Sequence, residues 1–286
     1  VSLNLLRWVS PNGLQTQAVL NNGNGVGNNV NSSVRAKYGR IAWTSIPTPA
    51  MVNEFRFGWF NDKQFDYPND ALAIPGIGFL GISITGQSNL GTAVDYPRKN
   101  PLENRYSYAD TLTWTRGKHT LKFGVDMMFT NDLTDLLFNR TGTYTFPSWS
   151  ALAADFSSNG GSKNWSSFSQ TIGNPVVQFT IPDYAFFVQD QYKLTPRLTV
   201  NLGLRYDYSS LPQPTVTNPD YAATGRIPTF GGDIAPRIGF AYALDSQSKT
   251  VVRAGYGIFY GRYPGGLINT LMLGNGVYQK SISLNG

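Results

Sequence analysis

The sequence predicts an all-β fold, an antiparallel transmembrane β-barrel of which this chain supplies about ten strands. Three observations predict it: two-faced strands of about ten residues, short turns that alternate with long loops, and a composition rich in aromatic but poor in charged residues. The clearest strand is 198–208, where Leu, Val and Tyr occupy every second position and polar residues or glycine fill the others. Side chains alternate between the faces of a strand, so this period indicates unlike surroundings on its two sides. About ten residues also suffice to cross a bilayer at a tilt.

The same alternation recurs along most of the chain. It is found in segments 55–59, 105–114, 120–130, 184–194, 237–244 and 252–260, and more weakly in 35–45. Short turns join these strands in pairs at 46–50, 116–118, 195–197 and 245–249. Long polar segments separate the pairs, at about 10–33, 63–103, 132–183, 210–234 and 261–276. This asymmetry is typical of outer-membrane barrels, with periplasmic turns and extracellular loops, and we expect equal numbers of strands in the two directions.

Composition narrows the classes of protein further. The 286 residues are 14% aromatic and only 14% charged, against roughly 25% charged in soluble domains. The net charge of +6 comes from scattered Lys and Arg, whereas nucleic-acid binding requires clusters, so we expect no nucleic-acid partner. The chain has no cysteine, which excludes disulfides and thiolate metal sites. The longest apolar stretch, 71–84, is broken by Pro75 and is too short for a membrane-spanning helix.

The charged residues indicate which strand face meets lipid. An Arg or Lys on the lipid face costs ~2–4 kcal/mol near the middle of the bilayer, so the polar face must line the interior. The predicted lumen-lining residues are Arg56, Lys122, Arg205, Asp207, Arg237 and Arg253. Two carboxylates, Asp110 and Asp190, lie on the apolar face instead. We expect them at the periplasmic rim, or redirected by a β-bulge.

Aromatic residues near strand ends are expected to form girdles at the two membrane interfaces. The predicted girdle residues are Trp59, Trp114, Tyr192, Tyr206, Tyr208, Tyr242, Tyr256 and Tyr260. The strand after each short turn carries an inward glycine, at Gly58, Gly124, Gly203 and Gly255. A glycine on the concave side of a curved sheet leaves room for larger neighbours.

The sequence offers little support for catalysis or cofactor binding. His119, the only histidine, begins a strand beside a turn, and is interpreted as a rim residue rather than a general base. The glycine-rich run 23–27 lacks the strand-to-helix context of a phosphate-binding loop. Asp132 and Asp135 could contribute to calcium binding, but their spacing matches no calcium loop. We therefore expect no enzymatic activity, no cofactor and no metal site.

Several segments together resemble a known family. Residues 184–207, YAFFVQDQYKLTPRLTVNLGLRYD, resemble the recurring strand–turn–strand of TonB-dependent outer-membrane receptors, and 114–124 resembles another of their hairpins. Residues 235–242 followed by 252–260 resemble a third hairpin. Residues 74–86 resemble a loop of the Oar-like branch, whose members carry a carboxypeptidase-regulatory-like domain. The resemblance implies a barrel of about 22 strands closed by a plug, which takes up a large or scarce solute through the bacterial outer membrane.

The resemblance also sets expectations for organisation and partners. Residues 1–286 should form part of one barrel domain, without plug, TonB box, signal peptide or closing aromatic C-terminal strand. The implied partners are outer-membrane lipid, the plug domain of a longer parent chain, the TonB complex through missing N-terminal parts, and an unknown extracellular solute. The loop 132–183 should make first contact with that solute, so deleting 150–170 should weaken uptake and spare insertion. As an isolated piece the strands should form an open curved sheet.

Two other functions are compatible with the pattern. One is a passive porin or adhesin-like barrel without energy coupling. The other is a soluble extracellular β-sandwich that binds carbohydrate through exposed aromatics, whose strands would bury their apolar face against a second sheet. Connections in such a sandwich are short on both sides, unlike those found here.

Overall fold

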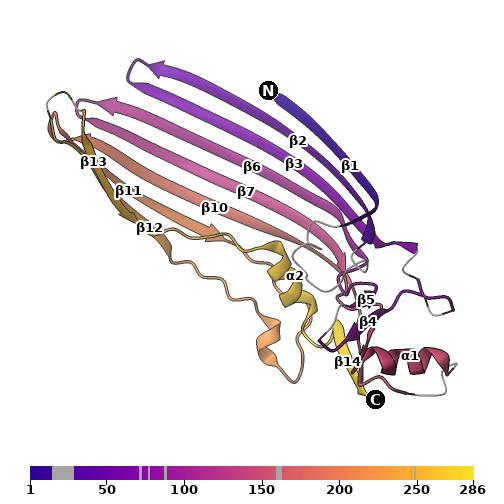
Figure 1. Cartoon of the computed structure of the whole chain (residues 1–286). Helices are drawn as coiled ribbons and strands as arrows, with labels where there is room; N and C mark the ends of the chain where they lie inside the picture. The colour runs from indigo at the N-terminus through magenta and orange to yellow at the C-terminus, as the bar shows by residue number, and fades with distance from the viewer. Residues whose placement is uncertain are drawn as a thin grey trace.

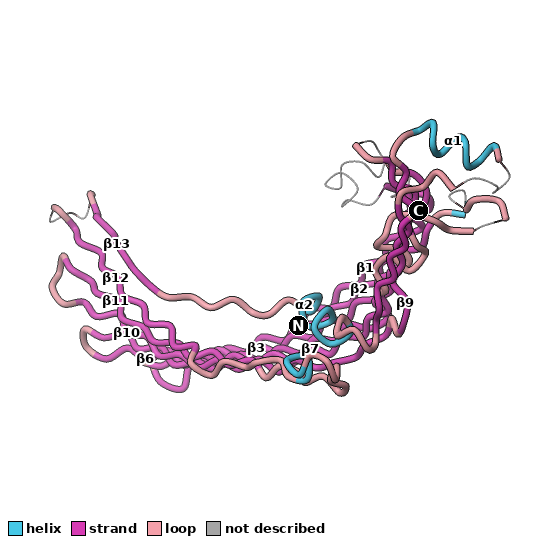
Figure 2. The backbone as a smooth tube through the Cα atoms, turned by 90° about the horizontal axis from the view of Figure 1, so that it is seen from below, coloured by secondary structure: helices cyan, strands magenta, loops and turns pink. Residues whose placement is uncertain are grey.

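The computed structural model describes residues 1–14, 29–70, 73–76, 78–86, 89–158, 163–245, 247 and 249–286. Its main feature is a nine-stranded antiparallel sheet, in the order β1-β2-β3-β6-β7-β10-β11-β12-β13, that curves into an open trough (Figures 1 and 2). The strands are β1 (Ser2–Leu14), β2 (Asn29–Thr48), β3 (Met51–Pro68), β6 (Arg98–Arg116), β7 (His119–Leu136), β10 (Val176–Lys193), β11 (Leu198–Ser209), β12 (Asp233–Ala243) and β13 (Val251–Gly257). Strands β1 and β13 are the edges of this sheet and do not pair with each other. The prediction of an all-β, partial and open barrel is confirmed.

The predicted short turns are confirmed by the strand register. Thr48 pairs with Met51 and Arg116 pairs with His119, whereas Lys193 pairs with Thr199 and Ala243 pairs with Val251 across longer turns. About ten strands were expected in one sheet, and the main sheet has nine. The last strand of the chain, β14 (Gln279–Asn285), belongs to a second sheet instead.

The second sheet lies at the end of the trough opposite the short turns (Figure 1). It has the order β14-β9-β8-β4-β5, with β4 (Gly81–Ile84), β5 (Leu90–Gly91), β8 (Thr143–Phe146) and β9 (Ser167–Gly173). Helix α1 (Trp149–Ser157) packs Leu152 against Ile82, Ile84 and Phe146 of this sheet. The prediction of long polar loops at 63–103 and 132–183 was therefore wrong in part, because both segments contain short strands and the second also contains α1. Strands of two to four residues are too short to show a period, and β3, β6, β7 and β10 also run further than expected.

The register places the apolar residues of neighbouring strands side by side on one face, which we call the outer face. One row of directly paired residues crosses six strands: Ile41, Phe57, Tyr108, Met127, Tyr184 and Tyr208. Their large apolar neighbours are exposed, with 48% of Leu204 and 56% of Ile238 accessible. Within the described part of the chain, no second sheet covers this face (Figure 2). The structure therefore contradicts the β-sandwich alternative.

The apolar band on the outer face is about as high as the apolar band of known outer-membrane barrels. On β7 it runs over about ten residues, from His119 at the turn to Phe129, and Asn131 is the next outer-face residue. Ten residues at ~3.4 Å span ~34 Å along the strand. At a tilt of ~35–45° that corresponds to a height of ~24–28 Å, close to the ~25 Å apolar band of outer-membrane barrels. Strand β7 continues to Leu136, so its last residues stand beyond the membrane on the loop side.

The two carboxylates on the apolar face differ in position. Neither lies at a register shift, so the β-bulge explanation is wrong for both. Asp190 is three residues from the end of β10 and accepts a 2.7 Å hydrogen bond from His119 Nδ1 if that nitrogen is protonated. Asp110 pairs with Phe55 and Val125, six residues before the end of β6. The rim position therefore holds for Asp190, whereas Asp110 lies in the middle of the apolar band.

The chain also folds back over the concave face at its loop end. The segment after β13 crosses this face and forms helix α2 (Gly265–Leu273) (Figure 2). Its Ile268 and Leu273 join an apolar cluster completed by Val177, Phe179, Ile181, Leu211 and Ile227. The 3-10 helix η4 (Ala222–Gly225) lies in the connection between β11 and β12. Neither α-helix in the described residues is long and apolar enough to cross a membrane.

The assignment of the faces can be tested on two adjacent residues of β10. Val188 lies on the outer face and Gln189 on the inner face, and both are exposed. We expect Val188→Arg to lower the free energy of unfolding by ~2–4 kcal/mol, because it places a cation in hydrocarbon. Gln189→Arg should change it by less than ~0.5 kcal/mol. Urea titration of the full-length protein in lipid vesicles measures both values, and equal costs would contradict the assignment.

The inward glycine of β7 gives a test of packing. A Cβ at Gly124 would lie 2.2 Å from the ring of Phe187, whereas a Cβ at Gly203 has only ordinary contacts from 3.7 Å. We expect Gly124→Ala to destabilise the sheet by ~1–3 kcal/mol through overpacking, and Gly203→Ala to be neutral or slightly stabilising. Adding Phe187→Ala should remove most of the Gly124→Ala penalty in a double-mutant cycle. An additive cycle would show that Phe187 does not require the glycine.

Candidate functional site on the inner face

The six predicted lumen-lining residues share the polar face of the nine-stranded sheet. Arg56, Asp126 and Asp207 belong to one row of paired positions, and Lys122 and Arg237 belong to another. The segment that returns after β13 contacts this face and lies in the hollow of the trough, so the polar face is the concave one (Figure 2). Contact of these side chains with lumen water stays a prediction.

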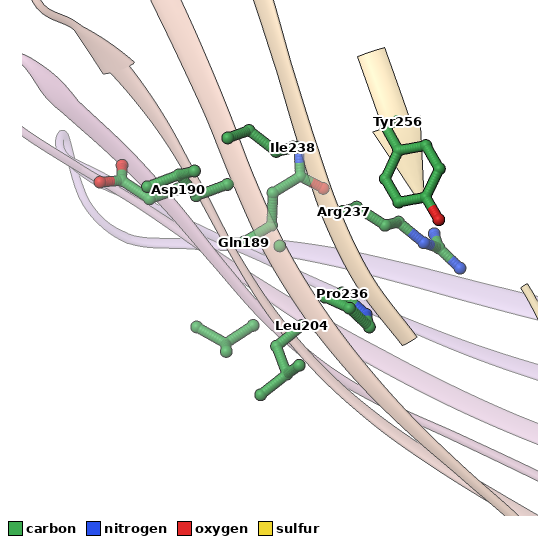
Figure 3. Close-up of a pocket in the computed structure, with 10 residues that line it drawn as sticks. Gln189, Asp190, Leu204, Pro236, Arg237, Ile238 and Tyr256 are labelled. Atoms are coloured by element: carbon green, nitrogen blue, oxygen red, sulfur yellow. The ribbon is translucent and has the colours of Figure 1, made fainter. Parts of the chain in front are cut away.

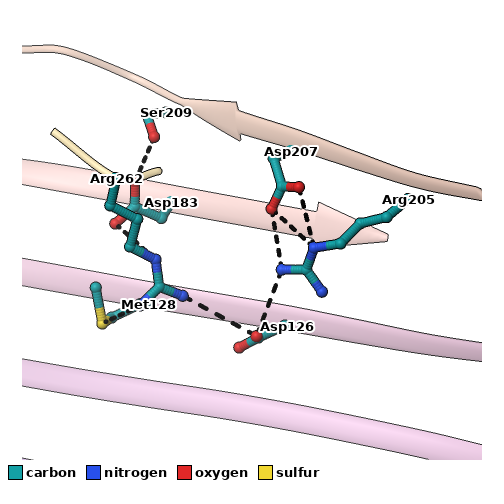
Figure 4. A network of polar contacts seen from close by, with 7 residues as sticks. All are labelled: Asp126, Met128, Asp183, Arg205, Asp207, Ser209 and Arg262. Atoms are coloured by element: carbon teal, nitrogen blue, oxygen red, sulfur yellow. Dashed lines mark hydrogen bonds and ion pairs between the residues drawn. The ribbon is translucent and has the colours of Figure 1, made fainter. Parts of the chain in front are cut away.

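A network of charges connects four parts of the inner face (Figure 4). Arg205 lies 2.9 Å from Asp207 on its own strand and 3.7 Å from Asp126 of β7. Arg262, in the coil after β13, lies 4.0 Å from Asp126 and 3.9 Å from Asp183 of β10. The network therefore joins β7, β10 and β11 and holds the returning segment against the wall.

The sequence alone predicted only part of this network. It placed Arg205 and Asp207 on the inner face, which is where they lie. It missed Asp183, which accepts a hydrogen bond from Ser209 Oγ, and Arg262, whose Nη1 lies 3.4 Å from Met128 Sδ. Period-two alternation assigns residues to faces, but no local signal indicates that a coil returns across four strands to form an ion pair.

Four of the predicted lumen-lining cations are left without a carboxylate partner in the described part of the chain. Within the described residues, Arg56, Lys122, Arg237 and Arg253 form no ion pair with a carboxylate. The guanidinium of Arg237 instead lies over the ring of Phe259, 4.4 Å from its centroid. Of the six predicted lumen-lining residues, only Arg205 and Asp207 neutralise each other. The four unpaired cations offer positive charge to whatever fills the trough.

Carboxylates gather on the loop-side half. Asp62, Glu103 and Asp132 are directly paired on β3, β6 and β7, beyond the end of the apolar band and therefore outside the membrane-spanning segments. Arg105 forms an ion pair with Glu103. Burial and the charge of Glu103 raise the pKa of Asp132 from 3.8 to about 6, and burial also raises the pKa of Asp62. One oxygen each of Asp62 and Asp132 is buried without a hydrogen-bond partner.

The structure brings together no catalytic or metal-binding set from the sequence candidates. Asp132 faces inward, whereas Asp135 lies on the opposite face and pairs with Lys99 and Arg140. In the described residues, no group of three or more potential ligands is placed to hold a metal ion. His119 stacks on Tyr192 at the turn end, with ring centroids 4.3 Å apart. The glycine-rich run 23–27 lies outside the described residues.

The predicted girdle residues occupy three kinds of position. Tyr192, Tyr242 and Trp114 lie within three residues of a short turn, and Trp59, Tyr206 and Tyr208 lie eight to ten residues from one. Tyr256 is the last residue but one of β13, five residues after its start. Tyr260 follows the end of β13 and belongs to the coil on the inner face, so the structure does not place it in an outer-face girdle. Interface contact of the others stays a prediction.

A mainly apolar depression is lined by residues of β10, β11, β12 and β13, most of them on the outer face (Figure 3). It has a volume of 460 Å³, and its lining includes Val188, Leu202, Leu204, Pro236, Ile238 and Tyr256. Asp190 contributes a carboxylate at its edge. Because the depression opens toward the lipid side, it suits an acyl chain better than a transported solute.

Comparison with known proteins agrees with this geometry. Residues 5–286 match the family described as outer membrane beta barrel domain, and the chain belongs to that family. Its place is therefore the bacterial outer membrane. No curated protein matches the chain. Among solved structures, the outer membrane transporter YddB from Escherichia coli is similar, with a TM-score of 0.50 and 13% sequence identity. The similarity covers 88% of this chain and 29% of that one, so this chain spans less than a third of that transporter.

The raised pKa of Asp132, in the row of Asp62, Glu103 and Asp132, predicts that the protein loses stability as pH rises from acid toward neutral. The folded-state pKa of Asp132 is raised to about 6, so between about pH 4 and pH 6 the folded protein holds more protons than the unfolded chain. The contribution of Asp132 to the free energy of unfolding should therefore fall as pH rises through this window, and stay low above it. We expect Asp132→Asn to remove the fall and to stabilise the protein at pH 7.

Asp245, in the turn between β12 and β13, provides a control because its contribution to stability should change with pH in the opposite direction. Backbone N–H groups of Lys249, Thr250 and Gln247 lower the pKa of Asp245, so its stabilising contribution is present above its ordinary pKa and is lost as pH falls. Asp245→Asn should therefore destabilise at pH 7 and not at pH 3. Urea titrations of both variants from pH 3 to pH 8 measure the slopes. Equal slopes in Asp132→Asn and the parent protein would contradict the assignment.

Proposed function

We propose that this chain is part of the wall of a TonB-dependent transporter of the Oar-like branch, which takes up a large or scarce solute. The observation that carries the proposal is the open trough with a charged concave face. Nine strands whose edges do not meet require further strands to close. Barrels with about 16 or more strands enclose a lumen, and in barrels of about 22 strands a plug fills that lumen. The similarity to an outer membrane transporter supports the same function.

The unpaired inner cations support a plug in the trough. Arg56, Lys122, Arg237 and Arg253 are four positive charges on an inner surface that a closed barrel would partly remove from water. A plug with carboxylates facing them would supply their counter-ions. The TonB complex would then act on the plug, through parts of the parent protein that lie outside this chain. We assign the chain itself no enzymatic role.

The second sheet and α1 support first contact with the solute on the outside of the cell. Trp149 and Phe156 of α1 are 48% and 59% exposed, and such amphipathic aromatic surfaces are common in binding sites. Deleting residues 150–170, as suggested from the sequence, would also remove part of β9, which pairs with β8 and β14. Substitution of the two exposed aromatics is therefore a cleaner way to alter this surface.

The proposal can be tested without knowing the solute. We expect the full-length protein in liposomes to be closed to small sugars, and the same protein without its plug to admit them in a swelling assay. A passive porin, the alternative function, would admit sugars at similar rates in both forms. In cells, uptake of a panel of labelled oligosaccharides and metal chelates should stop when the inner-membrane energy supply is removed. Uptake that continues unchanged would contradict TonB dependence.

A further inference from the structure

A group of four cations lies on the outer face of β1, β2 and β3, just beyond the apolar band. Lys37 is paired with Leu5 and Asn61, and one step further Arg35 is paired with Arg7 and Lys63. We call Arg7, Arg35, Lys37 and Lys63 the basic strip. All four side chains are exposed. Three of them form one row across three strands, so like charges stand directly opposite each other.

The basic strip has no internal counter-ion. Within the described residues none of its four cations forms an ion pair. The sequence contains no Asp or Glu before Glu54, so β1, β2 and their connection carry no carboxylate at all. On this face Asp135 of β7 is already paired with Lys99 and Arg140. Like charges directly opposite on neighbouring strands are destabilising, so an anion from outside the chain would relieve a cost present in the folded wall.

The floor beside the strip is apolar and belongs to the membrane band. Leu3, Gly39 and Trp59 are paired one row nearer the short turns, and an added Cβ at Gly39 would lie 3.7 Å from Trp59 and 3.9 Å from Leu3. The strip therefore begins where the apolar wall ends. Headgroups occupy this level, since they extend several Å beyond the hydrocarbon on each side of a bilayer.

We propose that the basic strip binds phosphate groups of lipid headgroups in the outer leaflet, with the acyl chains against Leu3 and Trp59. Arginine forms paired hydrogen bonds to phosphate, and lysine contributes a compact charge. Basic clusters next to an apolar membrane-facing surface attract anionic lipid with ~1 kcal/mol for each cation. A dissolved anion would satisfy the charges but would gain nothing from the apolar floor. This site lies on the opposite face from the transport pathway and does not depend on it.

The test measures lipid preference beside Trp59. The full-length protein is placed in vesicles of phosphatidylcholine with a minor share of either brominated phosphatidic acid or brominated phosphatidylcholine, and tryptophan quenching is compared. The contribution of Trp59 is isolated by subtracting the Trp59→Phe variant. We expect about a fivefold or greater preference for the phosphatidic acid, which weakens as salt is raised. Inorganic phosphate at millimolar concentration should not displace the lipid.

Two variants and one control decide the outcome. The variant Arg7→Gln/Arg35→Gln/Lys37→Gln/Lys63→Gln should abolish the preference. The single variant Arg35→Glu, which places a carboxylate between Arg7 and Lys63, should also lose it and should unfold at higher urea concentration. The control removes four charges from the inner face instead: Arg56→Gln, Lys122→Gln, Arg237→Gln and Arg253→Gln.

The proposal is overturned if the strip variants keep the preference, or if the inner-face control loses as much, because net charge would then be the cause. Displacement of the lipid by inorganic phosphate would show a site for free anions and not for headgroups. Insertion of each variant is checked by its heat-dependent shift in gel electrophoresis. A failure of sugar exclusion in the plug test would leave this result unaffected, since the two measurements concern opposite faces of the wall.

Discussion

Backbone hydrogen bonding is the constraint on which the rest of this wall depends. In hydrocarbon no water is available to N–H and C=O groups, so each strand must satisfy them through its neighbours. The ladders from β2 to β12 do this over most of their length. Those ladders also fix the register, and a slip by one residue would exchange the two faces of a strand. Such a slip on β11 would place Arg205 in lipid and Leu204 in the trough. The separation of charge from hydrocarbon is therefore a consequence of the hydrogen-bond ladders. At the sheet edges, β1 and β13 each have a partner strand on one side only within the described residues.

The same ladders continue beyond the membrane and shape the loop end. Strands β2, β3, β6, β7 and β10 have 18 to 20 residues, whereas β11, β12 and β13 have 12, 11 and 7. The long strands leave a high wall on one side. On the low side the chain turns inward, and α2 covers Phe179 and Ile181 of β10. Arg262 fastens this inward segment to the carboxylates of Asp126 and Asp183. The inner face is thus built partly by strands and partly by chain that returns to them.

How far the sequence predicts this structure depends on how local each feature is. The hairpin of β10 and β11 was predictable because both strands alternate over more than ten residues and a Thr-Pro-Arg turn separates them. The faces of Lys122 and Arg237 follow from the same period. Strands β5 and β8 were not predictable, because two and four residues cannot establish a period. The ion pairs of Arg262 depend on contacts more than 75 residues away in the chain. Asp110 shows the limit of cost arguments, since a carboxylate expected at the rim lies in the middle of the apolar band.

The charges of this wall separate into three groups according to what surrounds them. Arg205 and Arg262 are balanced by carboxylates of neighbouring strands, so the wall supplies its own counter-ions there. Lys122, Arg56, Arg237 and Arg253 face the hollow of the trough, where either water or a second part of the protein must solvate their charges. The basic strip faces the membrane side, where the strands end their apolar band. An isolated sheet in water would screen the last two groups by salt alone. In a closed barrel the solvent near both groups is restricted, so unpaired charge becomes more costly. The unpaired cations therefore support the two proposals made above, a plug inside the trough and lipid phosphates beside the basic strip.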